Sequence, residues 1–156
     1  MKTLLLAFTL ICSLATYAQT HEIGHTTITF NDPARTGGFG SGGGPGRQIQ
    51  SEVYYPADVA GTDVAAAMGE HPVIVFGHGF VMAWDAYANI WEELVPQGYI
   101  MIFPRTEGNF SPSHDDFGMD LALLVTKMQE LNTTGGSIFE NHVAAKSAIM
   151  GHSMGG

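Results

Sequence analysis

Apolar and polar positions follow two patterns along the chain. Residues 26–30 and 48–55 alternate apolar and polar side chains, as half-buried antiparallel strands do. Residues 73–76, 99–103 and 146–150 are short, mainly apolar runs, the first two bounded by proline or glycine, which predicts buried strands. The sequence therefore predicts an antiparallel strand pair followed by three more deeply buried strands.

Two helices are predicted between the buried strands. Residues 83–95 place aromatic and aliphatic side chains at helical spacing, and Gly98 follows as a stop signal. Residues 117–131 repeat an apolar residue every three or four positions, as an amphipathic helix does. Ser113 and Asp116 resemble a capping box at its start. The order strand, helix, strand, helix, strand indicates an α/β sheet.

A glycine-rich stretch at residues 36–46 lies between the first two predicted strands. Glycine-rich loops can cradle phosphate groups, but no Gly-Lys-Ser/Thr occurs here and no helix pattern follows. We therefore expect a flexible hairpin loop. Residues 57–69 are predicted to form a small-residue connector.

The first 18 residues have the composition of a secretory signal peptide. A basic residue is followed by the apolar stretch 4–14 and by small residues at 16 and 18, which predicts cleavage between Ala18 and Gln19. The apolar stretch is shorter than the roughly 20 residues needed to span a bilayer, so we expect no stable membrane anchor. The prediction is a secreted or periplasmic protein in which residues 19–156 form the N-terminal part of a single domain.

Composition after cleavage excludes several classes of function. The chain's one cysteine, Cys12, lies in the signal peptide and follows Ile11 rather than a small residue, which disfavours a lipoprotein anchor. The mature chain then has no disulfide and no thiol chemistry. Five basic and fifteen acidic residues remain, a formal charge of −10 with no basic cluster. Nucleic acid is therefore excluded as a partner.

The last six residues carry the most informative motif. Residues 151–156 read Gly-His-Ser-Met-Gly-Gly, a G-x-S-x-G pattern after a short predicted strand. In a nucleophile elbow such a serine, here Ser153, lies at the apex of a sharp turn in a strained backbone conformation. Taken alone, the pattern also fits an ordinary glycine–serine turn. A nucleophilic serine needs a histidine base and a carboxylate, which in this chain order come later, beyond residue 156.

A second motif, Phe-Gly-His-Gly-Phe at residues 76–80, ends the first buried strand. Acyl transfer needs two N–H donors for the developing oxyanion, and losing one costs on the order of 3 kcal/mol of transition-state stabilisation. We expect Met154 to supply one donor and Phe80 the other, with Val81 as the alternative. An ordinary glycine turn would explain this motif alone, but both motifs at this spacing favour a hydrolase.

The remaining candidate residues are weaker. His152 is not expected to be the base, because adjacency in a sharp turn points its ring elsewhere. His114, Asp115 and Asp116 are expected to form the acidic first turn of a helix, not a metal site. Phe80 and Trp84, with Met154, are candidates to line an acyl pocket, although Trp84 suits the core equally well. No metal and no cofactor are expected.

With these motifs in place, the chain resembles the N-terminal half of a secreted α/β-hydrolase, ending at the nucleophile elbow. The similar group contains chlorophyllase-like, dienelactone-hydrolase-like and cutinase-like polyester hydrolases, and the motifs do not settle the subgroup. The resemblance rests on residues 52–56, 71–80, 98–100 and 151–156.

The resemblance implies a serine hydrolase that cleaves small-molecule or polymeric carboxylic esters through an acyl-enzyme. Ser153 would be the nucleophile, with Phe80 and Met154 as oxyanion donors. The family's aspartate and histidine have no counterpart in these 156 residues. Since the family's sheet continues beyond the elbow strand, residues 148–150 would otherwise form a bare edge, so we expect an incomplete and, by itself, inactive sequence.

Three alternatives remain open. Amide or peptide hydrolysis uses the same groups as ester hydrolysis. A non-catalytic binding protein can keep the α/β-hydrolase scaffold without a full triad. An inactive truncated product would also fit the sequence. The oligomeric state is left open as well.

Overall fold

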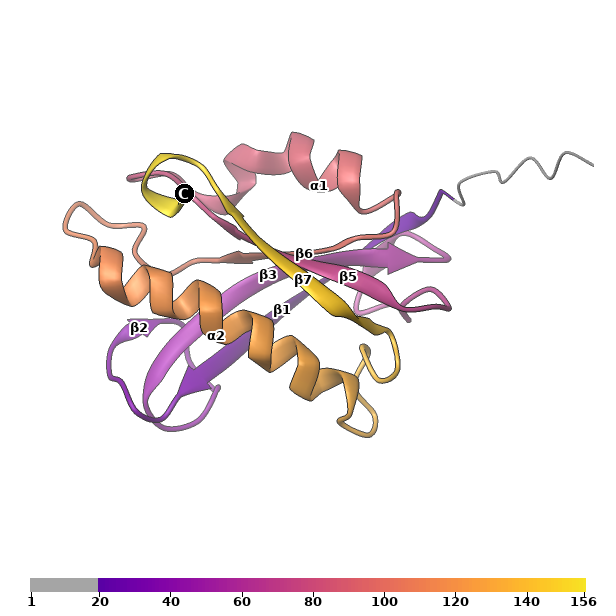
Figure 1. Ribbon diagram of the computed structural model, residues 1–156, viewed down its shortest axis with the longest axis horizontal. Helices are drawn as coiled ribbons and strands as arrows, with labels where there is room; N and C mark the ends of the chain where they lie inside the picture. Colours follow the sequence, from indigo (N-terminus) through magenta and orange to yellow (C-terminus); the bar gives the residue numbers. More distant parts are fainter. Residues whose placement is uncertain (1–19) are drawn as a thin grey trace, which may run out of the picture.

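The computed structural model describes residues 20–156 and forms a twisted sheet with a helix on each face (Figure 1). The predicted signal peptide and its cleavage site lie outside the described residues. The strands are β1 (Glu22–Asp32), β2 (Gly38–Phe39), β3 (Arg47–Ala57), β4 (Gly61–Thr62), β5 (His71–Gly77), β6 (Ile100–Pro104) and β7 (Val143–Gly151). The helices are α1 (Ala88–Leu94) and α2 (His114–Asn132), with 3-10 turns η1 (Trp84–Tyr87) and η2 (Ser153–Gly155).

The sheet runs in the order β4-β1-β3-β6-β5-β7, and β2 pairs with β3 outside this path. The predicted antiparallel pair is confirmed, because β1 and β3 pair from Glu22 opposite Ala57 to Asp32 opposite Arg47. β3 also runs antiparallel to β6, whereas β5 is parallel to both β6 and β7. The predicted α/β fold class is therefore confirmed, with an antiparallel section joined to a parallel one.

Each face of the sheet has its own hydrophobic core. Alternate residues of β5 point to opposite faces, as they must in a strand, so Val73 and Val75 pack under α2 while Ile74 and Phe76 pack under α1. All five residues of β6 are buried, as its continuous apolar run predicts. The two helices thus cover opposite faces of the same strands (Figure 1).

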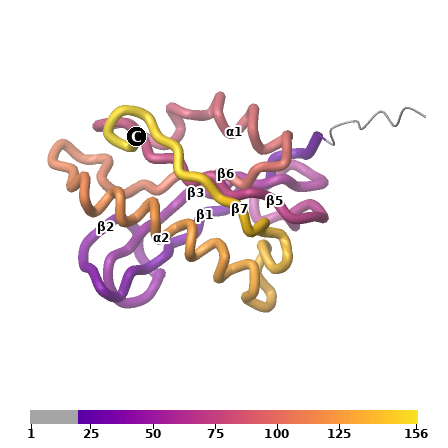
Figure 2. The backbone as a smooth tube through the Cα atoms, viewed as in Figure 1, coloured from indigo at the N-terminus to yellow at the C-terminus, as the bar shows by residue number. Residues whose placement is uncertain are grey.

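The path of the chain reverses at β5. It leaves β5 through α1 to reach β6, and then returns through α2 to β7 on the other side of β5 (Figure 2). The loops after β5 and β7 therefore begin side by side at the carboxyl edge of the sheet. Ligands of open α/β sheets bind at such a reversal point, so the topology brings the two sequence motifs to this edge.

The first predicted helix begins differently from its pattern. Residues 84–87 form η1 and the α-helix starts only at Ala88. Ala83, at the N-cap of η1, has no side chain that accepts a hydrogen bond from the first turn, which explains the tighter turn. The predicted stop is confirmed, since Gly98 has a φ of +101° and its N–H donates to the Val95 carbonyl at 2.9 Å.

Two predicted loops contain short strands. Gly38–Phe39, in the glycine-rich stretch, pairs in parallel with β3, so this stretch is not a plain hairpin loop. Gly61–Thr62, in the small-residue connector, pairs with β1. At the other end of the sheet order, β7 leaves its apolar residues exposed, Ile149 at 49% and Met150 at 41%, as expected for a strand with one neighbour.

Candidate active site

The turn after β7 holds Ser153 in a strained conformation. Ser153 has a φ of +55°, in the left-handed region that residues with a side chain rarely adopt, as the nucleophile-elbow interpretation predicts. Three backbone hydrogen bonds hold this turn: the His152 N–H donates to the Gly77 carbonyl at 3.0 Å, and the Gly155 and Gly156 N–H groups donate within the turn. The serine hydroxyl is thus placed at the end of the sheet, at the start of η2.

Glycines are required where this turn packs against β5. A Cβ added to Gly155 would overlap the backbone of Gly77, and one added to Gly151 would overlap the Gly155 carbonyl. A Cβ on Gly77 would lie 2.8 Å from the same carbonyl oxygen. The motif glycines therefore allow the two strand ends to meet backbone to backbone.

The loop after β5 carries the second predicted motif. It turns at Gly79, whose carbonyl accepts the Met82 N–H at 3.1 Å, and Val81 has a φ of +54°. A Cβ on Gly79 would lie 2.9 Å from the His152 Nδ1, so this loop lies against the residue before Ser153. Within residues 20–156, the N–H groups of Phe80 and Met154 donate to no other group of the protein.

The Tyr87 hydroxyl links the two loops. It accepts a hydrogen bond from the Gly79 N–H at 2.8 Å, and it lies 3.0 Å from the His152 Nδ1 and 3.1 Å from the Met82 Sδ. The His152 ring is thus in contact with Tyr87 through Nδ1, while the expectation that it does not act as the base stays a prediction.

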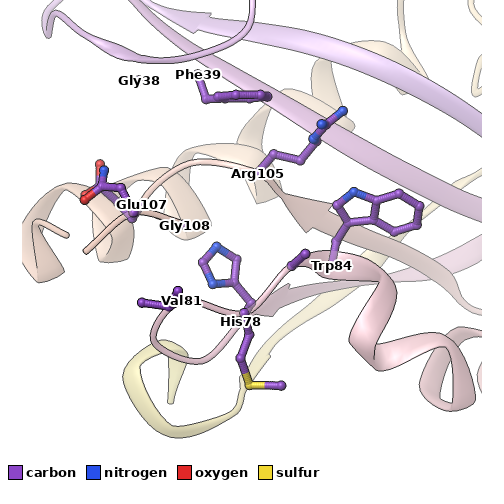
Figure 3. Close-up of a pocket in the computed structure, with 11 residues that line it drawn as sticks. Gly38, Phe39, His78, Val81, Trp84, Arg105, Glu107 and Gly108 are labelled. Carbon is purple, nitrogen blue, oxygen red and sulfur yellow. The ribbon is translucent and has the colours of Figure 1, made fainter. Parts of the chain in front are cut away.

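A cavity of about 410 Å³ opens beside the loop after β5 (Figure 3). Trp84, a predicted pocket residue, lines it together with Phe39 and Val81. The Arg105 guanidinium lies 4.9 Å from the centre of the Phe39 ring and donates to Gln50 and Glu52. The contribution of Phe39 was missed from the sequence, although it is the one aromatic residue in the glycine-rich stretch.

The other predicted pocket residues lie elsewhere. Phe80 is 52% exposed and does not line the cavity beside Trp84. Met154 packs against the core under α2 and lines a second cavity of about 380 Å³ between α2 and β7. The structure therefore does not bring Phe80, Trp84 and Met154 together around one cavity.

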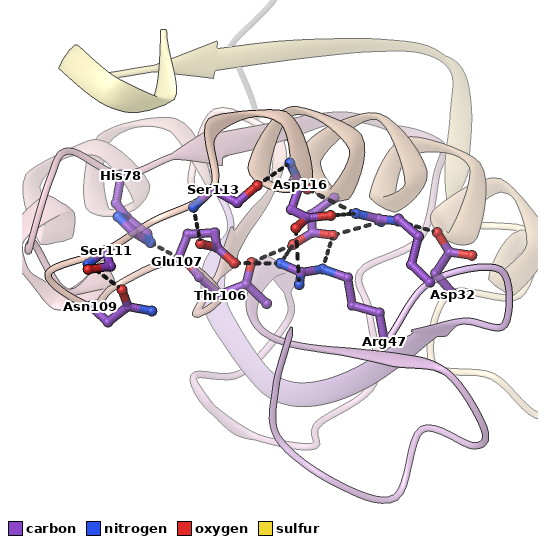
Figure 4. Close-up of polar contacts among 11 residues, drawn as sticks. Asp32, Arg47, His78, Thr106, Glu107, Asn109, Ser111, Ser113 and Asp116 are labelled. Atoms are coloured by element: carbon purple, nitrogen blue, oxygen red, sulfur yellow. Dashed lines mark hydrogen bonds and ion pairs between the residues drawn. The ribbon is translucent and has the colours of Figure 1, made fainter. Parts of the chain in front are cut away.

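A buried group of ion pairs lies behind the loops (Figure 4). The fully buried Asp120 carboxylate accepts from Arg47 at 2.9 Å through both Nε and Nη2, and from Arg35 at 2.8 Å. The Thr106 hydroxyl donates to the same carboxylate at 2.7 Å, and Glu107 accepts from Arg47 at 2.7 Å. Hydrogen bonding to Asp120 raises the pKa of Arg47 above its usual value. This group was missed from the sequence, although Asp120 lies among the apolar positions of the predicted helix and could have indicated it.

The first turn of α2 forms as expected. The Ser113 hydroxyl oxygen accepts the Asp116 N–H at 3.2 Å, which makes Ser113 the N-cap.

Across the part of the chain that the structure describes, no three His, Cys, Asp or Glu residues are grouped so that they could hold a metal ion. Among the same residues, no helix is long and apolar enough to cross a membrane.

Comparison with known proteins adds two findings. The model of the chlorophyllase family matches residues 54–156. Among solved structures, the chain is similar to a ferulic acid esterase from Streptomyces cinnamoneus, with a TM-score of 0.55 and 19% sequence identity. The similarity covers 92% of this chain and 55% of the esterase, so the chain spans about half the length of that protein. No curated protein matches the chain in sequence.

Proposed function

Because the chain belongs to the chlorophyllase family, we propose that the protein is a secreted serine hydrolase that cleaves carboxylic esters. Its partial α/β-hydrolase fold is shared with the ferulic acid esterase, and both names denote ester cleavage, which favours an ester over an amide substrate. Export would leave a mature protein that begins at Gln19, which N-terminal sequencing of the secreted product checks.

In the proposed reaction the Ser153 hydroxyl attacks the ester carbonyl and forms an acyl-enzyme, and the alcohol leaves. The N–H groups of Phe80 and Met154 stabilise the oxyanion in this step and again when water releases the acid. A histidine base and an orienting carboxylate are expected from residues beyond 156.

One observation carries this proposal. Ser153 is held at a φ of +55° in a turn whose glycines allow it to pack on the end of β5. Such strain persists only where the surrounding structure holds it, and it is concentrated at functional sites. Asp63, Glu107 and Asn141 also have a left-handed φ, so it is the combination with the glycine packing on β5 that supports a functional role for Ser153.

The proposal is tested with a fluorophosphonate probe and a p-nitrophenyl ester on the full-length gene product. We expect the probe to label Ser153 and Ser153→Ala to abolish both labelling and hydrolysis. Ser147→Ala is the matched control, because Ser147 is a serine of β7 outside the two loops of the candidate site, and we expect both signals to be unchanged. A p-nitroanilide of the same acid is expected to react more slowly than the ester.

The alternative function is a non-catalytic binding protein on the same scaffold. It predicts that the wild-type protein neither reacts with the probe nor hydrolyses the ester. Labelling at another residue, with Ser153→Ala unaffected, would likewise contradict the assignment of Ser153 as the nucleophile.

A further inference from the structure

His78 lies between two carbonyl oxygens directly after β5. Its ring is 2% exposed, with Nδ1 2.9 Å from the Gly79 oxygen and Nε2 2.8 Å from the Thr106 oxygen. A carbonyl oxygen only accepts, so any hydrogen bond at either position has a ring N–H as its donor. Both nitrogens are thus directed at backbone groups, and the ring is packed against Phe117 with centroids 4.7 Å apart.

The two peptide groups that flank Gly79 are therefore both fixed. The Gly79 N–H donates to the Tyr87 hydroxyl at 2.8 Å, while the Gly79 carbonyl is contacted by His78 and accepts the Met82 N–H. This matters because glycine leaves the backbone more conformational freedom than any other residue. Without these partners, the peptide group between Gly79 and Phe80 would be free to rotate.

The orientation of that peptide decides where the Phe80 N–H points. The described chain contains no cis peptide bond, so the Phe80 N–H points opposite to the Gly79 carbonyl and away from His78. Holding the carbonyl therefore also holds the N–H, the group assigned above to the oxyanion.

Tyr87 extends this control to the turn that carries the serine. Its hydroxyl bridges the Gly79 N–H and the His152 Nδ1, and His152 is the residue before Ser153. His152 is held independently by its own N–H, which donates to the Gly77 carbonyl. The bridge thus fixes the separation of the two loops from which Phe80 and Met154 would donate.

We propose that His78 and Tyr87 are positioning residues of the oxyanion hole. His78 sets the plane of the Gly79–Phe80 peptide, and Tyr87 sets the position of this loop against the serine turn. The inference rests on the proposed function. Neither side chain touches the reacting atoms, so each acts through the backbone N–H groups that stabilise the transition state.

A neutral imidazole carries one N–H and can donate to only one of the two oxygens, and the proposed role requires the donor to be Nδ1. Two substitutions of His78 separate the Nδ1 contact from the Nε2 contact. In His78→Asn the amide nitrogen takes the place of Nδ1 and can still donate to Gly79, whereas in His78→Gln it takes the place of Nε2 and can donate only to Thr106. We expect His78→Gln to lower kcat about 10- to 100-fold with little change in KM. This is less than the effect of removing an oxyanion donor, because the Phe80 N–H is still present but less well oriented. His78→Asn is expected to keep most of the activity.

Kinetics of ester hydrolysis and thermal melting are measured on the full-length product of both variants. A merely structural role would lower Tm but leave kcat of the folded protein, measured well below Tm, near the wild-type value in both variants. Equal activity of His78→Asn and His78→Gln, or the reverse order, would overturn the role assigned to the Nδ1 bond.

Tyr87→Phe removes the bridging hydroxyl and keeps the ring. We expect kcat and the rate of phosphonylation of Ser153 to fall together, by about tenfold or more, while KM stays near the wild-type value. Tyr54→Phe is the matched control, because its ring stacks on Trp91 in the same aromatic cluster, and among the described residues its hydroxyl has no hydrogen bond to the loop. Wild-type kinetics in a folded Tyr87→Phe protein would overturn the proposed bridge.

The outcomes distinguish the two proposals. If the wild-type protein shows no Ser153-dependent hydrolysis, the proposed function fails and the positioning role falls with it. If hydrolysis depends on Ser153 but all His78 and Tyr87 variants match the wild type, only the positioning role is wrong.

Discussion

At the scale of single residues, Ser153 has a backbone conformation that works against stability. A left-handed φ costs a residue with a Cβ about 1–2 kcal/mol, a penalty that glycine does not pay. The turn nevertheless keeps a serine there, held by the hydrogen bonds between His152 and Gly77 and within η2. The function proposed for its hydroxyl explains why this strain is retained.

Replacing the serine by glycine tests this strain. We expect the free energy of unfolding, measured by urea denaturation, to be about 1 kcal/mol higher for Ser153→Gly than for Ser153→Ala. The reason is that alanine keeps the Cβ that is strained at this φ. Both variants are expected to lack ester hydrolysis. Ser147→Gly and Ser147→Ala, in the regular part of β7, provide the control, where glycine is the less stable residue by about 0.5–1 kcal/mol. A Ser153→Gly protein that is less stable than Ser153→Ala would show that the turn carries no strain.

At the scale of elements, the ion pairs around Asp120 join three segments that are distant in sequence. Arg47 begins β3, Arg35 lies between β1 and β2, and Asp120 lies in the middle of α2. Thr106 connects this group to the site, because its hydroxyl donates to Asp120 and its carbonyl faces His78. The position of α2 against the sheet is therefore coupled to the loops that form the candidate active site.

The buried carboxylate should be hard to replace. We expect Asp120→Asn to lower the free energy of unfolding by about 3–5 kcal/mol, because it leaves two arginines without their shared charge partner. Urea denaturation of the full-length product measures this change. The control is Glu130→Gln, which removes the exposed pair with Lys127 at 2.8 Å and should change stability by less than about 1 kcal/mol. Equal effects of the two substitutions would contradict the role given to burial.

Elements with a local signal were predicted well from the sequence, and those that depend on distant partners were not. The strands β3, β5 and β6 and the helix α2 follow apolar patterns that are complete within each segment. The pairings of β2 and β4 are fixed by neighbouring strands, and their glycine-containing sequences carry no strand pattern of their own.

The candidate site divides in the same way. Ser153, Phe80 and Met154 were predicted from two short motifs, and the structure brings the corresponding loops together at Gly77 and Gly79. Tyr87 and Phe39 were missed because their roles depend on contacts with residues distant in sequence. Phe80, Trp84 and Met154 do not line one cavity as predicted. The direction of a side chain in a turn depends on the local backbone angles, which the sequence pattern does not give.

At the scale of the whole molecule, Tyr55 joins the hydrophobic core to the connector of residues 57–69. The fully buried ring lies 5.2 Å from that of Phe139, and its hydroxyl donates to the Val64 carbonyl at 2.7 Å. A Cβ on Gly24 would overlap the same ring, so β1 also packs closely over it. Four segments of the chain therefore meet at one neutral hydroxyl-bearing side chain.

Tyr55 should make global stability sensitive to alkaline pH. Burial, with the charge of Asp63 as a smaller cause, raises the pKa of Tyr55 from 10.0 to about 12. The native state then holds the proton that the unfolded state loses, so this stabilisation is complete below about pH 10 and is lost as the pH rises through about 12. In Tyr55→Phe the ring cannot ionise, and the lost hydrogen bond lowers stability at neutral pH by about 1 kcal/mol. We therefore expect urea unfolding to show a stability gap between wild type and Tyr55→Phe that is constant up to about pH 10 and narrows above it. A gap that stays constant at higher pH would mean that the Tyr55 hydroxyl ionises equally in the native and unfolded states.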